Sequence, residues 1–238
     1  MTKFLTSSLG KKTVMALSGL FLCLFLVEHL YTNVHLFFGD GGKEFNEASH
    51  NMVHSIIIRI IEVVLFLAII VHVAQALLLT KDNMDARPVK YAVSGVSKTS
   101  NWFSRNMLLT GSIIFFFIVV HLYNFFVPYR VTGEAVGPYE TEAIAQGAET
   151  LAMEVSEALM NPIYAIIYLF SVLLLAFHLN HGFQSAFQTL GVNNQKYCKI
   201  WKMVGTGFSV LIGIGFGSFP IFFQLAKYIG FDALNWNM

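Results

Sequence analysis

Five long apolar runs constrain the fold of this chain more than any other feature of the sequence. They cover approximately Val14–Phe38, Val53–Leu79, Met107–Val127, Ile163–Leu190 and Met203–Ile229. A helix needs roughly 20 mostly apolar residues to cross the hydrocarbon core of a bilayer. Because lipid offers no hydrogen-bond partners, backbone groups inside a span must pair within their own segment, which favours helices. The sequence therefore predicts an all-α integral membrane protein with five transmembrane helices.

The composition agrees with a membrane protein. Of the 238 residues 12% are charged and 55% are hydrophobic, whereas soluble domains have about 25% charged residues. The net charge of +1 gives no reason to expect a nucleic acid partner. The two cysteines, Cys23 and Cys198, are too few for a disulfide framework or a four-thiolate iron–sulfur cluster. There is no CxxCH motif, so a haem would be held without covalent attachment.

Residues 1–238 are predicted to form a single transmembrane domain, since no segment long enough for a soluble domain remains between the spans. The longest connection, Pro128–Asn161, contains an amphipathic stretch at Glu142–Met160 that we expect on the bilayer surface.

Charges at the ends of the spans predict the orientation. One side of the membrane carries Lys3, Lys11, Lys12, Lys81, Arg87, Lys90, Lys98, Arg105, Lys196, Lys199 and Lys202. The other side carries only Lys43, Arg130 and Lys227 among many glutamates. By the positive-inside rule, the N-terminus is predicted to be cytoplasmic and the C-terminus outside.

Histidines inside the spans are the candidate functional residues. They are His29, His72, His121, His178 and His181. A polar group at this depth is costly and is a functional candidate by default, although histidine also forms hydrogen bonds between helices. Helices alternate in direction, so the histidines of the first and third spans are expected toward the outside, and those of the second and fourth toward the cytoplasm. Two levels of paired histidines are what two bis-histidine haems b require.

Three glycines, Gly19, Gly111 and Gly182, are candidates for the small neighbours that haem faces need, although glycine also serves ordinary helix packing.

Two local segments carry a resemblance to a known family. The first is KKTVMALSGL at Lys11–Leu20, which leads to HLYTN at His29–Asn33, and the second is FHLNHGFQSA at Phe177–Ala186. Together with the number of helices and the placement of histidines, they resemble the five-helix, di-haem cytochrome b subunit of succinate:quinone oxidoreductases, which anchors succinate dehydrogenase or fumarate reductase. The resemblance implies an inner (cytoplasmic) membrane protein that binds two haems b and menaquinone. It also implies a flavoprotein and an iron–sulfur protein as partners, with the dicarboxylate chemistry on those chains.

The resemblance also implies the ligand pairs. His29 would pair with His121 at the outer haem, and His72 with His178 at the inner haem. His181 is the alternative to His178, because residues three apart on a helix share a face and only one can be the axial ligand. The family ligand is typically followed four residues later by glycine, and Gly182 gives His178 that spacing.

Two glutamates inside the spans, Glu28 and Glu62, are candidates for proton transfer to or from a quinone. The alternative for Glu62 is a neutralising pair with Arg59, three residues away on the same helix. The family's usual carboxylate positions do not match these residues.

Two other functions compete with a succinate:quinone oxidoreductase anchor. One is the quinone-reactive cytochrome b of another respiratory dehydrogenase, which the distribution of histidines over four helices disfavours. The other is a histidine-lined transporter, which the lack of a visible internal repeat disfavours.

Overall fold

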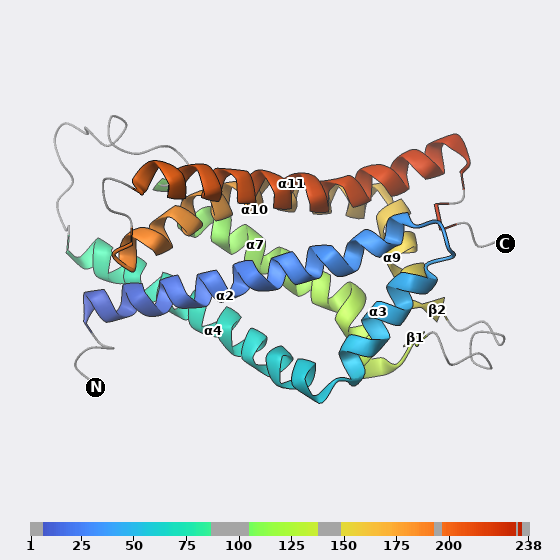
Figure 1. Cartoon of the computed structure of the whole chain (residues 1–238), viewed down its shortest axis with the longest axis horizontal. Coiled ribbons are helices and arrows are strands. Elements are labelled where there is room, and N and C mark those ends of the chain that lie inside the picture. Colours follow the sequence, from blue (N-terminus) through green and yellow to red (C-terminus); the bar gives the residue numbers. More distant parts are fainter. Residues whose placement is uncertain (1–6, 87–104, 138–148, 193–196, 232, 235–238) are drawn as a thin grey trace. The chain divides into compact units, whose positions relative to one another are not determined.

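The computed structural model describes residues 7–86, 105–137, 149–192, 197–231 and 233–234. Within them, five helices are long and apolar enough to cross a membrane, at Ser8–Phe37, Ile56–Asp85, Met107–Thr132, Pro162–Thr189 and Cys198–Ile229. The predicted all-α membrane fold with five spans is confirmed at this level. Figure 1 labels the elements in chain order. Several residues of the orientation argument, Lys3, Arg87, Lys90, Lys98 and Lys196, lie outside the described part of the chain.

The first two spans differ from their predicted bounds. Helix α2 begins at Ser8, six residues before the start of the apolar run, and ends at Val34, after which the 3-10 helix η1 covers His35–Phe37. A short helix, α3 (Lys43–His54), precedes the second span α4 (Ile56–Asp85). The span therefore begins after Val53, because Ser55 has an extended backbone that separates the two helices.

The turn between η1 and α3 depends on glycine. Gly39, Gly41 and Gly42 have φ values of +66°, +75° and +75°. Residues with side chains rarely adopt this left-handed region, so three closely spaced glycines allow the sharp change of direction. The turn connects η1 to α3.

The third span changes its helix type at a histidine. Helix α7 (Met107–His121) continues as a π-helix, η2, over Leu122–Thr132, with Pro128 inside it. Proline cannot donate a backbone hydrogen bond. π-Helical segments are rare in proteins, and those that occur are often found at functional sites. The span therefore extends beyond the predicted end at Val127, and the change of helix type directly follows His121.

Asn161 separates the short helix α9 (Leu151–Met160) from the fourth span. Its side-chain oxygen accepts a hydrogen bond from the backbone N–H of Ile163 at 3.0 Å. Pro162 occupies the first turn of α10 (Pro162–Thr189), where its missing N–H costs nothing. Helix α11 covers Cys198–Ile229 and runs through Pro220.

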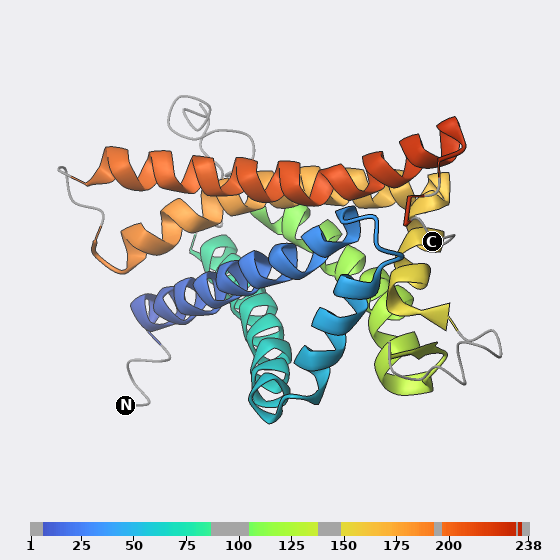
Figure 2. The ribbon, with the colours of Figure 1, turned by 45° about the vertical axis from the view of Figure 1, so that its right-hand side comes forward.

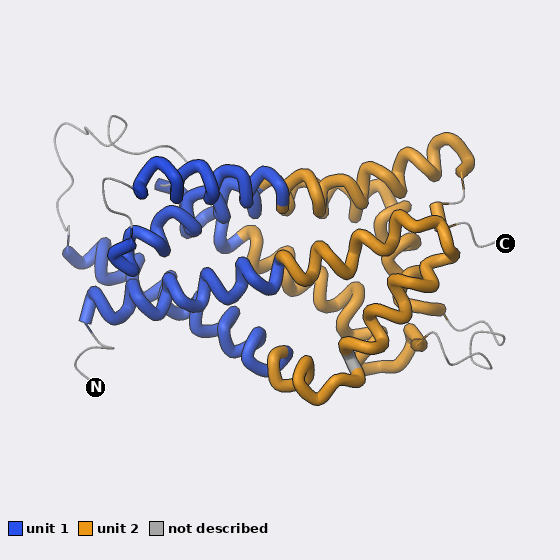
Figure 3. The backbone as a smooth tube through the Cα atoms, in the orientation of Figure 1, with its two compact units in different colours: residues 1–26, 62–112, 174–211 blue, residues 27–61, 113–173, 212–238 orange. Residues whose placement is uncertain are grey.

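The chain divides into two compact units, which are coloured in Figure 3. Unit 1 comprises residues 1–26, 62–112 and 174–211, and unit 2 comprises residues 27–61, 113–173 and 212–238.

Unit 1 is held together by a few specific contacts between helices. The Lys11 ammonium group forms an ion pair with Asp82 at 2.6 Å, which joins α2 to α4. Asn180 on α10 accepts hydrogen bonds from Gln184 at 2.7 Å and from Thr206 on α11 at 3.1 Å. Such polar contacts are a common means of joining helices in lipid.

Unit 2 contains a hydrophobic core that includes Leu36, Phe45, Val155, Phe219 and Phe223. Two short elements, β1 (Ala135–Val136) and β2 (Glu149–Thr150), pair in parallel, with Ala135 opposite Glu149. Helix α9 (Leu151–Met160) follows β2 and packs against α3, as the views in Figures 1 and 2 agree.

Side chains from other helices satisfy both ends of α9. The buried Asn46 of α3 accepts a hydrogen bond from the backbone N–H of Ala152 at 3.0 Å. At the other end, Gln224 donates to the carbonyl of Leu159 at 2.8 Å and Lys227 to that of Met160 at 2.9 Å. A ten-residue helix is marginal by itself, so these contacts explain its stability.

The predicted amphipathic stretch at Glu142–Met160 lies partly outside the described residues. In its described part, Ala152, Val155 and Leu159 are buried in the core of unit 2. Protein therefore covers the apolar side of α9, and the expected position of this stretch on the bilayer surface stays a prediction.

The spanning helices, in contrast, present apolar side chains outward. Helix α4 has no buried residue, and its exposed side chains include Ile60, Val63, Leu67 and Ile70. An apolar surface of this extent requires an apolar solvent. The exposed apolar surface of these helices is therefore suited to a lipid bilayer.

Candidate functional site

Two histidines face each other within unit 1. His72 on α4 and His178 on α10 have ring centroids 6.3 Å apart, with an angle of 64° between the ring planes. Both side chains are partly buried. The two residues are 106 positions apart in sequence, so only the packing of α4 and α10 brings them together.

Each of these two rings has a hydroxyl group at its Nδ1 atom. Ser18 Oγ on α2 lies 3.2 Å from His72 Nδ1. Thr110 Oγ1 on α7 lies 3.5 Å from His178 Nδ1. Neither residue was predicted from the sequence, although Ser18 belongs to the KKTVMALSGL segment.

A glycine next to each hydroxyl residue makes room for the same ring. A Cβ atom added at Gly19 would lie 3.2 Å from His72 Cε1, and one added at Gly111 would lie 3.4 Å from His178 Cε1. Gly182, the third candidate, has no described atom within 4 Å of that position. Gly19 and Gly111 therefore border histidine rings, whereas Gly182 borders neither ring. The expected role of the three glycines beside haem faces stays a prediction.

A second histidine pair lies within unit 2. His29 on α2 and His121 at the end of α7 have ring centroids 5.6 Å apart, and their planes are almost perpendicular at 86°. Phenylalanine rings lie next to both histidines. The ring centroid of Phe216 is 5.4 Å from that of His29, and the ring centroid of Phe125 is 5.2 Å from that of His121. Aromatic rings therefore border both histidine rings.

Polar groups also contact the Nδ1 atoms of this pair. The Tyr168 hydroxyl lies 3.4 Å from His121 Nδ1 and accepts a hydrogen bond from Asn124 at 3.4 Å. The Asn33 amide donates to the backbone carbonyl of His29 at 2.7 Å and lies 3.5 Å from His29 Nδ1. Tyr168 was not a candidate in the sequence analysis, because a tyrosine in a span gives no distinctive pattern.

His178 and His181 differ in their surroundings. The ring of His178 faces His72, as described above. Among the residues that the structure describes, no hydrogen bond or ring contact joins His181 to another side chain. The geometry therefore brings together the two pairs expected from the sequence, and ligation by them stays a prediction.

The spacing within both pairs is compatible with a haem. Metal–imidazole bonds are about 2 Å long, so two imidazoles on opposite faces of a haem have centroids roughly 6 Å apart. The unit 1 pair has this separation and the unit 2 pair is slightly closer. With glycines bordering the unit 1 rings and aromatic side chains around the unit 2 pair, the residues present fit this cofactor.

The two candidate carboxylates belong to different units. In unit 2, the Thr32 hydroxyl donates a hydrogen bond to Glu28 at 2.8 Å, next to His29 in sequence. Glu62 is a partly buried residue of unit 1. Their proposed role in proton transfer stays a prediction.

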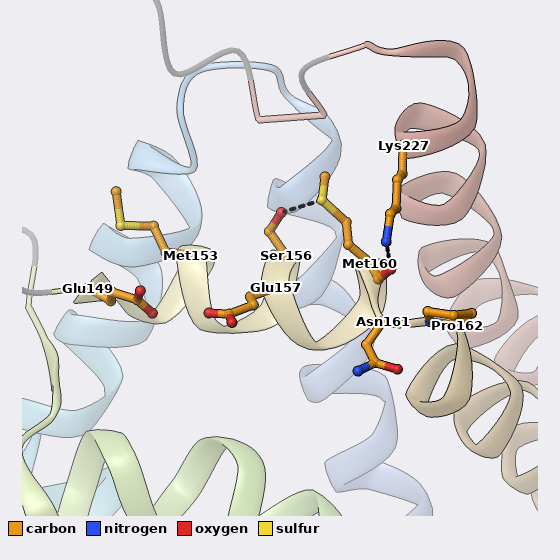
Figure 4. Close-up of a pocket in the computed structure, with 8 residues that line it drawn as sticks. All are labelled: Glu149, Met153, Ser156, Glu157, Met160, Asn161, Pro162 and Lys227. Atoms are coloured by element: carbon orange, nitrogen blue, oxygen red, sulfur yellow. Dashed lines mark hydrogen bonds between the residues drawn. The ribbon is translucent and has the colours of Figure 1, made fainter.

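An open pocket of about 630 Å³ lies in unit 2 beside α9 (Figure 4). Its polar lining consists of Glu149, Ser156, Glu157, Asn161 and Lys227. The Lys227 ammonium group donates to the carbonyl of Met160, so it serves the end of α9. The pocket therefore lies beside the contacts that stabilise the end of α9.

The pKa of Glu154 on α9 is raised above its ordinary value. Burial is the largest cause, followed by the nearby carboxylates of Glu149, Glu157 and Glu134. Negative charge on these neighbours disfavours ionisation of Glu154.

Within the described part of the chain, no group of three or more histidine, cysteine, aspartate or glutamate side chains could hold a metal ion. A bis-histidine haem needs only two, since the porphyrin supplies the other ligands. Comparisons with protein-family models, with curated proteins and with solved structures found no match.

Proposed function

We propose that this chain is the membrane-anchoring electron-transfer subunit of a succinate:quinone oxidoreductase, with two haems b and a menaquinone. The proposal rests on two histidine pairs, whose ring centroids are 6.3 Å apart in unit 1 and 5.6 Å apart in unit 2. Each contact joins two different spanning helices. Two such pairs in one chain match the requirement of two bis-histidine haems.

In this proposal, His72 and His178 hold one haem, and His29 and His121 hold the other. Haem supplies one-electron chemistry when bound. The chain's own residues hold the imidazoles, border their rings with small or flat side chains and exclude water from the apolar surroundings. We propose His178 rather than His181 as the ligand, because His178 faces His72.

The remaining parts of the proposal rest on the family resemblance. The partners are a flavoprotein and an iron–sulfur protein on the cytoplasmic side of the inner membrane, where the N-terminus also lies. When bound, the haems would supply a one-electron path between the iron–sulfur partner and menaquinone. Glu28 or Glu62 exchanges protons with the quinone, which needs them when it is reduced.

The first experiment is a dithionite-reduced minus oxidised spectrum of the detergent-purified protein, with haem quantified per chain. The proposal expects two low-spin haems b per chain. Absence of haem from a properly assembled preparation would overturn it and leave the transporter as the better hypothesis.

Histidine variants then test the assignment. His72→Ala and His178→Ala are each expected to lose one haem, and His29→Ala and His121→Ala to lose the other. His181→Ala is the matched control and should keep both haems. If His178→Ala keeps two low-spin haems while His181→Ala loses one, the ligand on α10 is His181.

Co-purification from native membranes tests the partners. A flavoprotein and an iron–sulfur protein should accompany the chain, and succinate should reduce its haems. A chain that carries haem but co-purifies with the subunits of another dehydrogenase would support the competing cytochrome b function.

A further inference from the structure

Two buried hydroxyl groups in unit 1 contact the histidine rings proposed to bind haem. Ser18 is 9% exposed and Thr110 is 1% exposed. Ser18 Oγ lies 3.2 Å from His72 Nδ1, and Thr110 Oγ1 lies 3.5 Å from His178 Nδ1. The first distance is at the upper end of the usual N–H···O range, and the second is at the limit of a hydrogen bond.

The hydroxyl protons have other acceptors on their own helices. Ser18 donates to the carbonyl of Met15 at 3.1 Å. Thr110 lies 3.2 Å from the carbonyls of both Asn106 and Met107. Serine and threonine in transmembrane helices commonly bond back in this way. A hydroxyl has a single proton and two lone pairs, so one that donates to a carbonyl can only accept from a neighbouring ring nitrogen.

This arrangement determines which nitrogen of each ring carries the proton. If the hydroxyl accepts at Nδ1, then Nδ1 is protonated and Nε2 has the free lone pair. Only an unprotonated nitrogen can ligate a metal. Each hydroxyl therefore favours the tautomer in which Nε2 is the ligand atom, and the backbone carbonyl of Met15 is a second hydrogen-bond partner of the His72 ring.

The same dipeptide pattern occurs twice, on two different helices. Ser18 and Gly19 on α2 contact the ring of His72, and Thr110 and Gly111 on α7 contact the ring of His178. In each case the hydroxyl lies at Nδ1 and the glycine at Cε1 of the same ring. A buried hydroxyl that served only its own helix would have no reason to recur beside a glycine at a histidine ring.

We propose that Ser18 and Thr110 are positioning residues that fix the ring orientation and tautomer of His72 and His178 and thereby lower the reduction potential of the haem in unit 1. This inference rests on the proposed function. A hydrogen bond from Nδ1–H makes the opposite nitrogen a stronger donor, and a stronger donor favours ferric over ferrous iron. Hydrogen bonding around the ligands is one of the means by which proteins set haem potentials.

The test is a potentiometric titration of both haems in the detergent-purified protein, with electron paramagnetic resonance of the ferric state. Ser18→Ala should raise the midpoint potential of one haem and leave the other unchanged. At the wild-type midpoint, its ratio of reduced to oxidised haem should increase roughly twofold to tenfold, as expected for the loss of one hydrogen bond. Thr110→Val should shift the same haem by less, because its contact is longer.

Conservative and control variants separate positioning from packing. Ser18→Thr and Thr110→Ser keep the hydroxyl and should restore the wild-type midpoint and ferric spectrum. Ser112→Ala is the matched control on α7, because this exposed serine donates to the Leu108 carbonyl at 2.8 Å and has no other side-chain hydrogen bond among the described residues. It should change neither haem.

The outcomes distinguish this inference from the proposed function. If both haems are present and neither Ser18→Ala nor Thr110→Val changes a midpoint or a ferric spectrum, the inference is overturned and the proposed function stands. If Ser18→Ala loses the haem, recovery of haem in Ser18→Thr supports the inference, and failure to recover it contradicts a role for the hydroxyl. A wild-type protein without haem overturns the proposed function itself.

Discussion

Replacing Gly19 by alanine places one methyl group against the ring of His72. The added carbon would lie 3.2 Å from His72 Cε1 and 3.6 Å from Nδ1. Carbon atoms prefer a separation of about 3.5–4.0 Å, so the ring must withdraw by a few tenths of an ångström. Ser18 contacts the same ring at 3.2 Å, so a withdrawal also stretches that hydrogen bond.

The magnitude follows from the cost of overpacking. Extra methyl groups in well-packed interiors cost about 1–3 kcal/mol. If this cost falls on the haem-bound state, affinity for the haem proposed in unit 1 decreases by about fivefold to 150-fold. At Gly111 the added carbon would lie 3.4 Å from His178 Cε1, so a smaller decrease is expected.

Gly207→Ala is the matched control, because Gly207 is an exposed residue of α11 and no described atom lies within 4 Å of the added carbon. Alanine is favoured over glycine in a helix by about 1 kcal/mol, so this variant should be slightly more stable and keep both haems. The assay is the rate of haem transfer from each purified variant to an excess of a haem-scavenging protein. Haem release from Gly19→Ala that is no faster than from wild type, or release from Gly207→Ala as fast as from Gly19→Ala, would contradict a packing role for Gly19 beside the His72 ring.

Three further predictions concern unit 2. Asn46→Ala leaves the buried N–H of Ala152 without its acceptor, at a cost of about 1–3 kcal/mol, so hydrogen exchange in α9 should accelerate, whereas Asn46→Asp should keep wild-type exchange. The pKa of Glu154 is raised on folding, so the folded state loses stability as pH rises from the ordinary glutamate pKa through the raised value. Thermal unfolding across that window should show this decline in the wild type and a weaker one in Glu154→Gln. Tyr168→Phe removes the hydroxyl 3.4 Å from His121 Nδ1, and a redox titration should show an altered midpoint for the unit 2 haem alone; a change in the other haem would contradict the assignment.

Hydropathy alone was sufficient to find the five spans, because a helix in lipid must be apolar over a length fixed by the bilayer. Their ends were harder to place. Helix α2 starts at Ser8, within a polar segment, and α4 starts only after Ser55. Each end depends on local backbone conformation and hydrogen bonds, to which hydropathy is insensitive.

The sequence did not show that α3 and α9 are separate short helices. Helix α9 depends on Asn46, Gln224 and Lys227, which come from two other helices. Its own ten residues carry an amphipathic pattern that equally fits a helix on the bilayer surface. The choice between lipid and protein as the partner of its apolar side was made by the core of unit 2.

For the candidate site, the sequence by itself determined which helices carry histidines, because polar residues stand out in apolar spans. It could not choose between His178 and His181 by spacing, since both lie on overlapping faces of one helix. Ser18 and Thr110 gave no signal either, because hydroxyl residues in a helix satisfy themselves on their own backbone. Only the packing of α2 on α4 and of α7 on α10 decided which ring faces which, and which hydroxyl lies at each Nδ1 atom. Contacts between residues far apart in sequence depend on rotation of each helix about its axis, and that rotation is set by side-chain packing rather than by hydropathy.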